Sequence, residues 1–143
     1  MQGLMRALLI VAPIVIVQTL AGCESTPPVV QPNWVMTPIS DFKNIAGKWQ
    51  GMMVEHPHPP RGAGDWVRVA ITEDGRYQFS SYRGVGVFSG SGTMTLSDGK
   101  AYTKTDRGNS VSTLHTADGR RMLRVSAKTT DGMEYSADLE PAK

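Results

Sequence analysis

The Asp-Gly dipeptide is the feature that most constrains the fold of this chain, because it recurs between short segments of alternating character. It occurs at Asp74-Gly75, Asp98-Gly99, Asp118-Gly119 and Asp131-Gly132. Asp-Gly is a strong hairpin signal, since a type I′ turn requires positive φ at both central residues. These dipeptides predict four two-residue hairpins, which looser loops join into a meander of antiparallel strands.

Apolar and polar side chains alternate in the segments between these turns. In the segment 133–140, for example, Tyr135, Ala137 and Leu139 alternate with polar and charged residues. A period of two is typical of strands with one buried face, and beyond a single helical turn expected at 41–46 no segment has the period of a helix. The expected strands are 47–54, 65–72, 76–82, 86–96, 101–106, 110–117, 120–128 and 133–140.

A meander of such strands must protect its two edge strands from pairing with other chains. Closing the sheet into a barrel removes both edges. We therefore expect an all-β domain, a small antiparallel up-and-down barrel of about eight strands, with a two-sheet β-sandwich as the alternative. A barrel of this size is either filled by its own side chains or just wide enough to hold one small ligand.

The start of the chain has the layout of a secretory signal peptide. Arg6 supplies a positive charge, the apolar run 7–17 follows, and the small residues Ala21 and Gly22 end the segment. A permanent membrane span takes about 20 apolar residues, whereas this run is interrupted by Pro13 and followed by polar residues. Cleavage after residue 22 is therefore expected.

Leu20-Ala21-Gly22-Cys23 directly follows this run and contains the only cysteine of the chain. The tetrapeptide resembles the lipobox of bacterial lipoproteins, whose Cys is lipidated and becomes the first mature residue. The resemblance implies a diacylglyceryl thioether and an acylated amine, with palmitate as the expected chain, on Cys23; several acyl chains make a stable anchor. Glu24 stands where the family's inner-membrane retention signal has Asp, which favours the outer membrane, with the protein facing the periplasm. The alternative is a secreted protein with a free thiol.

The mature chain is expected to consist of a lipidated, proline-rich linker over 23–38 and a barrel domain over 39–143. Prolines among polar residues predict an extended spacer, in which Trp34 and Val35 are apolar enough to dock on the domain. Without residues 1–22 the chain has 14 basic and 13 acidic side chains. This balance argues against nucleic-acid binding, and the single cysteine leaves the core to be held by packing alone.

Gly47-Lys48-Trp49, at the start of the first expected strand, resembles the G-x-W motif of lipocalins and their calycin relatives. In that family the Trp closes one end of the barrel and a late Arg packs across it. Arg121 or Arg124 is the candidate for that arginine here. The domain is shorter than a usual lipocalin and has no clear counterpart of the family's second motif. The resemblance implies a small calycin-like barrel.

His56 and His58 lie in a proline-rich loop after the first expected strand, with acidic residues on either side. Two imidazoles with carboxylates can hold zinc or copper, but a third histidine, His115, would have to come from a distant strand. A stiff exposed loop is the favoured interpretation. We therefore expect no metal site and no cofactor.

The strand 86–96 belongs to an unusually glycine-rich region. Gly84, Gly86, Gly90 and Gly92 share one parity, so they leave one face of this strand without side chains. The cleared face is either a smooth surface for a ligand or the mark of a strand that bends at a barrel corner. The corner is favoured, because barrel closure requires glycine at such bends.

No catalytic constellation is recognisable, since the chain lacks G-x-S-x-G and its paired acids lie in a turn or on a polar face. An enzyme is therefore not expected. Trp49, Tyr77, Phe79 and Tyr135 are the candidate lining of a ligand pocket. Two functions remain open: a lipid-anchored module that binds a small apolar ligand, and a protein whose filled barrel docks on an envelope complex.

Overall fold

Ten strands and one short 3₁₀ helix make up the part of the chain that the computed structural model describes, residues 31–57, 64–81 and 89–143. In chain order they are β1 (Val35–Thr37), η1 (Phe42–Asn44), β2 (Gly47–His56), β3 (Asp65–Ile71), β4 (Arg76–Ser81), β5 (Ser89–Thr93), β6 (Thr95–Ser97), β7 (Lys100–Thr105), β8 (Gly108–Ala117), β9 (Arg120–Thr129) and β10 (Glu134–Pro141). The predicted all-β class is confirmed, and the helical turn expected at 41–46 is η1.

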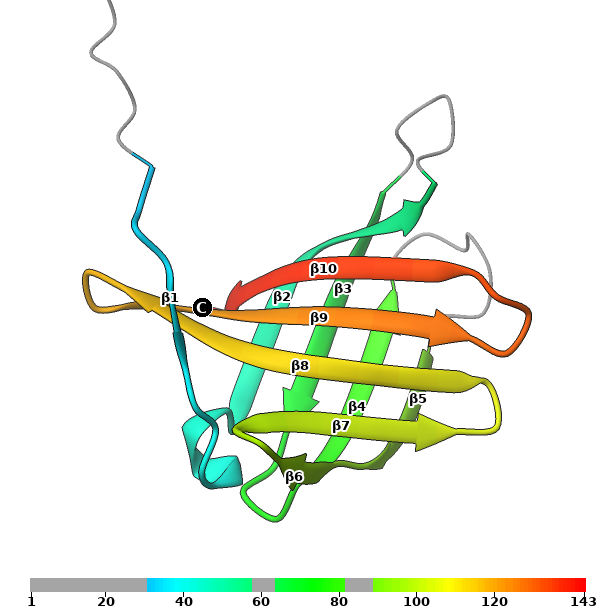
Figure 1. Ribbon diagram of the computed structural model, residues 1–143, viewed down its shortest axis with the longest axis horizontal. Coiled ribbons are helices and arrows are strands. Elements are labelled where there is room, and N and C mark those ends of the chain that lie inside the picture. The colour runs from blue at the N-terminus through cyan, green and yellow to red at the C-terminus, as the bar shows by residue number, and fades with distance from the viewer. Residues whose placement is uncertain (1–30, 58–63, 82–88) are drawn as a thin grey trace, which may run out of the picture. The chain divides into compact units, whose positions relative to one another are not determined.

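The strands follow their sequence order around a nearly closed antiparallel barrel (Figure 1). Pairing runs β5-β4-β3-β2-β10-β9-β8-β7-β6, so that β10 lies beside β2 and joins the two ends of the chain's meander. The two strands at the limits of this order, β5 and β6, are consecutive in the sequence. The predicted up-and-down barrel is therefore confirmed, and the expected strand 86–96 is divided into β5 and β6.

Met94 separates these two strands and brings the barrel's edges together. The strand before it pairs with β4, and the strand after it pairs with β7. The Met94 N–H donates to the carbonyl of Gly75 at 2.8 Å, and its side chain is buried in the core. One bend thus transfers the chain from one edge of the sheet to the other.

Two of the four Asp-Gly hairpins have the predicted two-residue form. Asp98 and Gly99 have φ angles of 49° and 71°, and Asp118 and Gly119 have 48° and 74°. Both central residues of each turn therefore lie in the left-handed region that a type I′ hairpin requires. These turns join β6 to β7 and β8 to β9.

The other two Asp-Gly pairs lie in three-residue loops, which corrects the prediction. In the loop after β3, the Gly75 N–H donates to the Thr72 carbonyl at 3.0 Å, and the Thr72 N–H donates to the Arg76 carbonyl at 2.9 Å. Gly75 has a φ of 82°, whereas Asp74 receives a hydrogen bond from the Thr72 hydroxyl and keeps a negative φ. The loop 129–133 repeats this arrangement. A Thr two residues before the Asp-Gly is common to both.

One end of the barrel is closed by the segment 38–46. Its helix η1 is capped by Asp41, whose side chain accepts the Lys43 N–H at 2.9 Å. Ile39 and Ile45, on either side of η1, are buried among the hydrophobic residues of the strands. The whole core cluster comprises Ile39, Ile45, Trp49, Val67, Ile71, Met94, Ala101, Leu114, Leu123, Ala137 and Leu139.

Trp49 and Arg121 hold this closed end together. The Trp49 indole is 2% exposed, and its Nε1–H donates to the Ile45 carbonyl at 2.8 Å. The Arg121 guanidinium lies 5.2 Å from the centroid of the Trp49 ring and donates to the Asn44 carbonyl. Such a cation–π contact contributes about 0.5–2 kcal/mol. Of the two arginines considered from the sequence, Arg121 is the one that packs across the Trp, and Arg124 lies on the outer face.

The last residues of the expected linker belong to the barrel. β1 pairs with the end of β8, and the Trp34 ring lies 5.4 Å below the guanidinium of Arg120. The docking expected for Trp34 and Val35 is thus observed. Residues 31–143 form one compact unit that contains every described strand and the core, and a unit with its own core can fold by itself.

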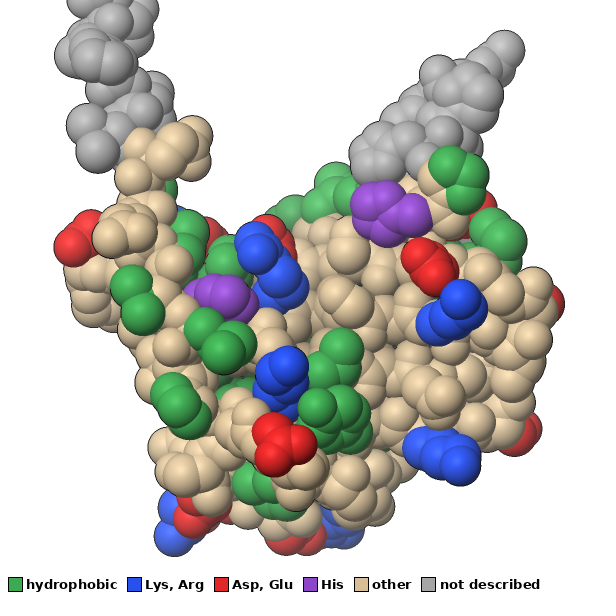
Figure 2. Space-filling model, in the orientation of Figure 1, with side chains coloured by type: hydrophobic (Ala, Val, Ile, Leu, Met, Phe, Trp, Pro, Cys, Tyr) green, Lys and Arg blue, Asp and Glu red, His purple; other side chains and the backbone are tan. Residues whose placement is uncertain are grey.

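The outer face of β9 and β10 carries ion pairs between the strands. Arg124 binds Asp138 through two hydrogen bonds of 2.7 and 2.9 Å, and Lys128 binds Glu134 at 2.9 Å. Figure 2 shows basic and acidic side chains close together on the face that these strands form. The hydrogen bonds from Arg124, together with its charge, lower the pKa of Asp138.

We predict that Asp138→Asn destabilises the barrel at neutral pH but not in acid. A carboxyl group with a lowered pKa stabilises the fold above its unfolded pKa, and this contribution is lost as the pH falls through the folded value. Because both side chains are about half exposed, at 49% and 51%, the loss is at most about 1 kcal/mol. Urea unfolding at neutral pH and at about pH 2 would measure it; a difference that persists in acid contradicts the assignment.

Candidate functional site

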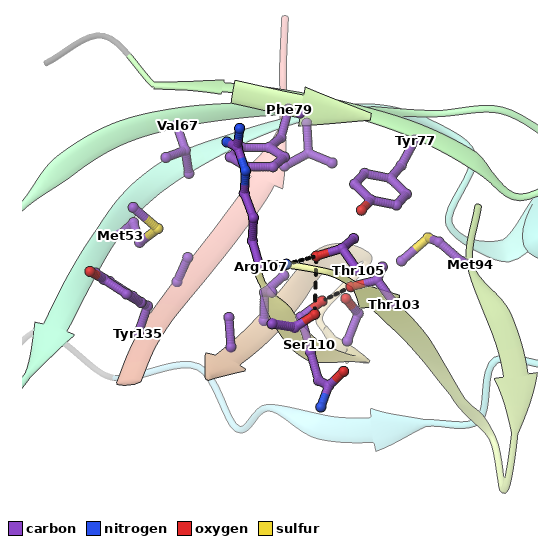
Figure 3. Close-up of a pocket in the computed structure, with 18 of the residues that line it drawn as sticks. Met53, Val67, Tyr77, Phe79, Met94, Thr103, Thr105, Arg107, Ser110 and Tyr135 are labelled. Atoms are coloured by element: carbon purple, nitrogen blue, oxygen red, sulfur yellow. Dashed lines mark hydrogen bonds between the residues drawn. The ribbon is translucent and has the colours of Figure 1, made fainter. Parts of the chain in front are cut away.

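The barrel contains a cavity of about 450 Å³. Its lining extends from Ile71 and Met94, near the end closed by η1, to Arg107 and Asn109 at the opposite end, and strands from all sides contribute to its wall (Figure 3). Its lining comprises Met53, Val67, Val69, Ile71, Tyr77, Phe79, Ser89, Gly90, Ser91, Met94, Thr103, Thr105, Asp106, Arg107, Gly108, Asn109, Ser110, Ser112, Leu123, Val125, Ala127, Lys128, Thr129, Tyr135, Ala137 and Leu139. The volume falls within the range of about 300–1,000 Å³ found for small-molecule sites.

One wall of the cavity is apolar. β3 contributes Val67, Val69 and Ile71 at alternate positions, because successive side chains of a strand point to opposite faces. The inward positions of β9 and β10 continue this wall through Val125 and Leu139, among others. A ligand in contact with these side chains gains stability from buried apolar area, at about 25 cal/mol per Å².

The aromatic rings of β4 lie over glycines of β5. Phe79 is the register partner of Gly90, and Tyr77 that of Gly92. A Cβ at Gly90 would lie 3.0 Å from the Phe79 ring, and one at Gly92 would lie 3.1 Å from the Tyr77 ring. The cleared face expected from the glycine parity therefore faces inward and provides space for these rings. Gly84 and Gly86 lie outside the described residues.

The opposite wall, on β7 and β8, is polar. The hydroxyls of Thr103 and Ser110 are hydrogen-bonded to each other at 2.7 Å, and Ser112 is buried beside them in the same inward row. The Thr105 hydroxyl donates to the Gly108 carbonyl at 3.1 Å. Arg107, from the turn between these strands, points toward the cavity (Figure 3). The cavity is thus amphipathic, with hydroxyl groups facing an apolar wall.

A seam between β5 and β7 bounds the cavity on one side. Within the described residues, β5 pairs only with β4, and β7 pairs only with β6 and β8. Ser89, Gly90 and Ser91 line the cavity from one side of the seam, and Thr103 and Thr105 do so from the other. The cavity wall there consists of two facing strand edges instead of a continuous hydrogen-bonded ladder.

The structure brings together three of the four side chains predicted to line a pocket. Tyr77, Phe79 and Tyr135 line the cavity. Trp49 does not, because it lies at the closed end beneath Arg121. Burial, followed by the charges of Glu55 and Asp131, raises the pKa of the Tyr135 phenol.

The predicted histidine loop lies partly within the described residues. His56 forms a hydrogen bond of 2.7 Å with Ser136 on the outer face of β10, and His115 bonds with Thr113 on β8. Among the described residues, no group of three or more His, Cys, Asp or Glu side chains could hold a metal ion. His58 and the lipidation candidate Cys23 lie outside those residues.

Sequence reasoning missed the hydroxyl wall and one buried acid. Thr103, Ser110 and Ser112 were assigned to strands, but their polarity gave no reason to place them inside. Asp65 is one of the two acids that flank the histidine loop in the sequence, yet it is 4% exposed and begins β3 on its inward face. The available signal was the parity that Asp65 shares with Val67 and Val69.

A comparison with known protein families, with curated proteins and with solved structures finds no match. Within the described residues, no helix is long and apolar enough to cross a membrane.

We predict that Tyr135 titrates above the ordinary pKa of 10.0 for a tyrosine and that Glu55→Gln moves its pKa down toward that value. Removing the negative charge favours the phenolate, because like charges disfavour one another's ionised forms. Ultraviolet absorbance titration of the barrel would measure the shift, and Tyr135→Phe would assign the signal. An unchanged pKa in Glu55→Gln would show that the carboxylate does not act on this phenol.

Proposed function

We propose that this protein is a lipid-anchored binding protein of the bacterial cell envelope, whose barrel holds one small ligand with a largely apolar body. The observation that carries the proposal is the cavity of about 450 Å³ with one apolar and one polar wall. Ligand sites are typically concave and mostly apolar, with a few polar groups that fix the ligand's orientation. This cavity has that composition.

The choice of side chains at inward positions supports a hollow interior. A small barrel of this kind can be filled by its own side chains, and protein interiors are normally packed to high density. Here several inward positions carry small residues, among them Ser110, Ser112 and Ala127. Larger apolar residues at these positions would fill the space and stabilise the core.

The closed end supports the calycin-like resemblance. Trp49 belongs to the G-x-W run, and Arg121 stacks on its indole ring, as the resemblance implies for that family. The contact blocks the bottom of the barrel and leaves access from the opposite end or the seam. The short length of the domain and the lack of a second motif make the family assignment part of the proposal.

The anchor is proposed from the sequence of the N-terminus. Leu20-Ala21-Gly22-Cys23 places a lipidated cysteine at the start of the mature chain, and Glu24 favours the outer membrane. β1 begins at Val35, so about a dozen residues separate the lipid from the barrel. A fully extended chain of that length reaches about 40 Å, which lets the barrel work in the periplasm while it stays tethered.

A second candidate function is docking on another envelope protein. Met52 and Trp66 are register partners on the outer face of β2 and β3, and they are 47% and 41% exposed. Exposed apolar patches commonly mark interaction sites. The cavity favours ligand binding as the primary role, and this patch is the surface through which a partner would bind.

We predict that Ala127→Phe abolishes ligand binding while Ser126→Phe does not. Ala127 lines the cavity, so a phenyl ring there occupies the ligand's space, whereas its neighbour Ser126 is exposed on the outer face. Native mass spectrometry of the barrel purified from its own host would detect the adduct. Loss in both variants, or in neither, contradicts a site inside the barrel, and an unliganded wild-type barrel favours the docking function.

We also predict that Cys23→Ser moves the protein from the membrane fraction to the soluble fraction. The substitution keeps the size of the side chain but removes the thiol that accepts the lipid. Cell fractionation and mass spectrometry of the N-terminal peptide would test this, the latter separating loss of the lipid from retention of the uncleaved segment 1–22. An N-terminal peptide without lipid in the wild type would contradict the proposed anchor.

A further inference from the structure

The carboxyl group of Asp65 is buried and has no hydrogen-bond partner among the described residues. Its residue is 4% exposed, and among the described residues neither carboxyl oxygen has a hydrogen-bond partner. Leaving a buried polar group unsatisfied costs about 1–3 kcal/mol, and more when the group is charged. Nearly all buried polar groups in native proteins are satisfied. This acid is therefore a costly feature that packing of the barrel does not require.

Asp65 lies on the inward face of β3 at the open end of the barrel. It continues the row of Val67, Val69 and Ile71, which line the cavity. Its register partner is Met53, another lining residue. Asp65 is not itself a lining residue; it lies one inward position beyond the apolar wall, in the direction of the barrel's open end.

A second acid lies near the same rim. Glu55 follows Met53 at the next inward position of β2 and is the register partner of Tyr135, which lines the cavity. Its charge also contributes to the raised pKa of the Tyr135 phenol. The β2–β3 side of the open end therefore presents two inward acids.

Among the described residues, the basic groups near the rim are not paired with these acids. Lys128 is paired with Glu134 at 2.9 Å on the outer face. Arg107, on the β7–β8 turn, points toward the cavity, but it is exposed and has Asp106 beside it in the sequence. Exposed charges are screened by water and salt, whereas buried charges are screened much less. Within the described residues, the Asp65 carboxyl therefore lacks a hydrogen-bond donor, and a positively charged donor would match it best.

We propose that the ligand carries a protonated amine that donates to Asp65, while its apolar body fills the cavity. A primary ammonium has three N–H donors, so it satisfies both carboxyl oxygens and neutralises the charge together. The hydroxyl wall of β7 and β8 then faces the middle of the ligand. This inference rests on the proposed binding function and specifies its ligand as an apolar amine.

Three probes that share a decyl chain test the inference: decylamine, decanol and decanoic acid. Residues 31–143 would be titrated with each by calorimetry at neutral pH, below the concentrations at which the probes aggregate. A hydrogen bond to a charged group contributes about 1.5–3 kcal/mol, so decylamine is expected to bind at least about tenfold more tightly than decanol. Asp65→Asn is expected to remove this preference and leave the affinity for decanol unchanged.

Asp138→Asn is the matched control, because it makes the same change on the outer face. It should leave the preference for decylamine intact. The melting temperature of the empty Asp65→Asn protein gives a second readout, which is expected to be equal to or above that of the wild type. A carboxyl group that served the fold through a partner within the chain would make the same substitution lower the melting temperature, and that result overturns the inference.

The remaining outcomes separate the inference from the proposed function. Binding of decanol and decylamine with equal affinity leaves the binding function in place and overturns the role of Asp65. Asp65 is also not the group that selects the ligand if the preference for decylamine survives in Asp65→Asn, or if decanoic acid binds most tightly. In both cases the binding function itself remains in place. Failure of all three probes to bind overturns the binding function and the inference together.

Discussion

The pairing of backbone hydrogen bonds around the barrel is the constraint on which the rest of this structure depends. A strand edge exposes unpaired N–H and C=O groups, and closure is the most complete way to satisfy them. β10 supplies one junction by pairing with β2 along its length. Met94 supplies the other, because the chain bends there and pairs with β4 before the bend and β7 after it. The bend closes the sheet near η1 but leaves β5 and β7 facing each other without a ladder farther along.

The two ends of the barrel follow from this geometry and have opposite character. Near the bend the strands converge, and Trp49, Ile39 and Ile45 fill the space between them. The cavity begins at Met94 itself and extends away from the bend, and along it the inward positions change from large apolar residues to hydroxyls. A packed base therefore supports a more open end with more polar inward side chains.

The sequence predicted the fold well because the relevant signals are local. Asp-Gly dipeptides marked the hairpins, and a period of two gave nearly every strand. Two hairpins have three-residue loops, in which the hydroxyl of a preceding Thr donates to the Asp side chain. A prediction based on the Asp-Gly dipeptide alone does not take this contact into account. The site was harder to predict. The alternation of side chains shows which residues share a face of a strand. It does not show which face points into the barrel when both faces carry polar residues, as they do on β7 and β8. The burial of Asp65 was missed although its strand was expected to begin there, because a charged residue is rarely buried and is normally expected on an exposed face.

The contact between aromatic rings and glycines on β4 and β5 also bears on how such a barrel can diversify. Phe79 and Tyr77 lie where they do because Gly90 and Gly92 have no side chains to displace them. A single methyl group at either glycine would come within about 3 Å of a ring and oblige that ring to shift, without removing the backbone ladder between the strands. The shape of the cavity could therefore be tuned during evolution by substitutions at two positions that contribute nothing to the hydrogen-bonded framework beyond their backbone.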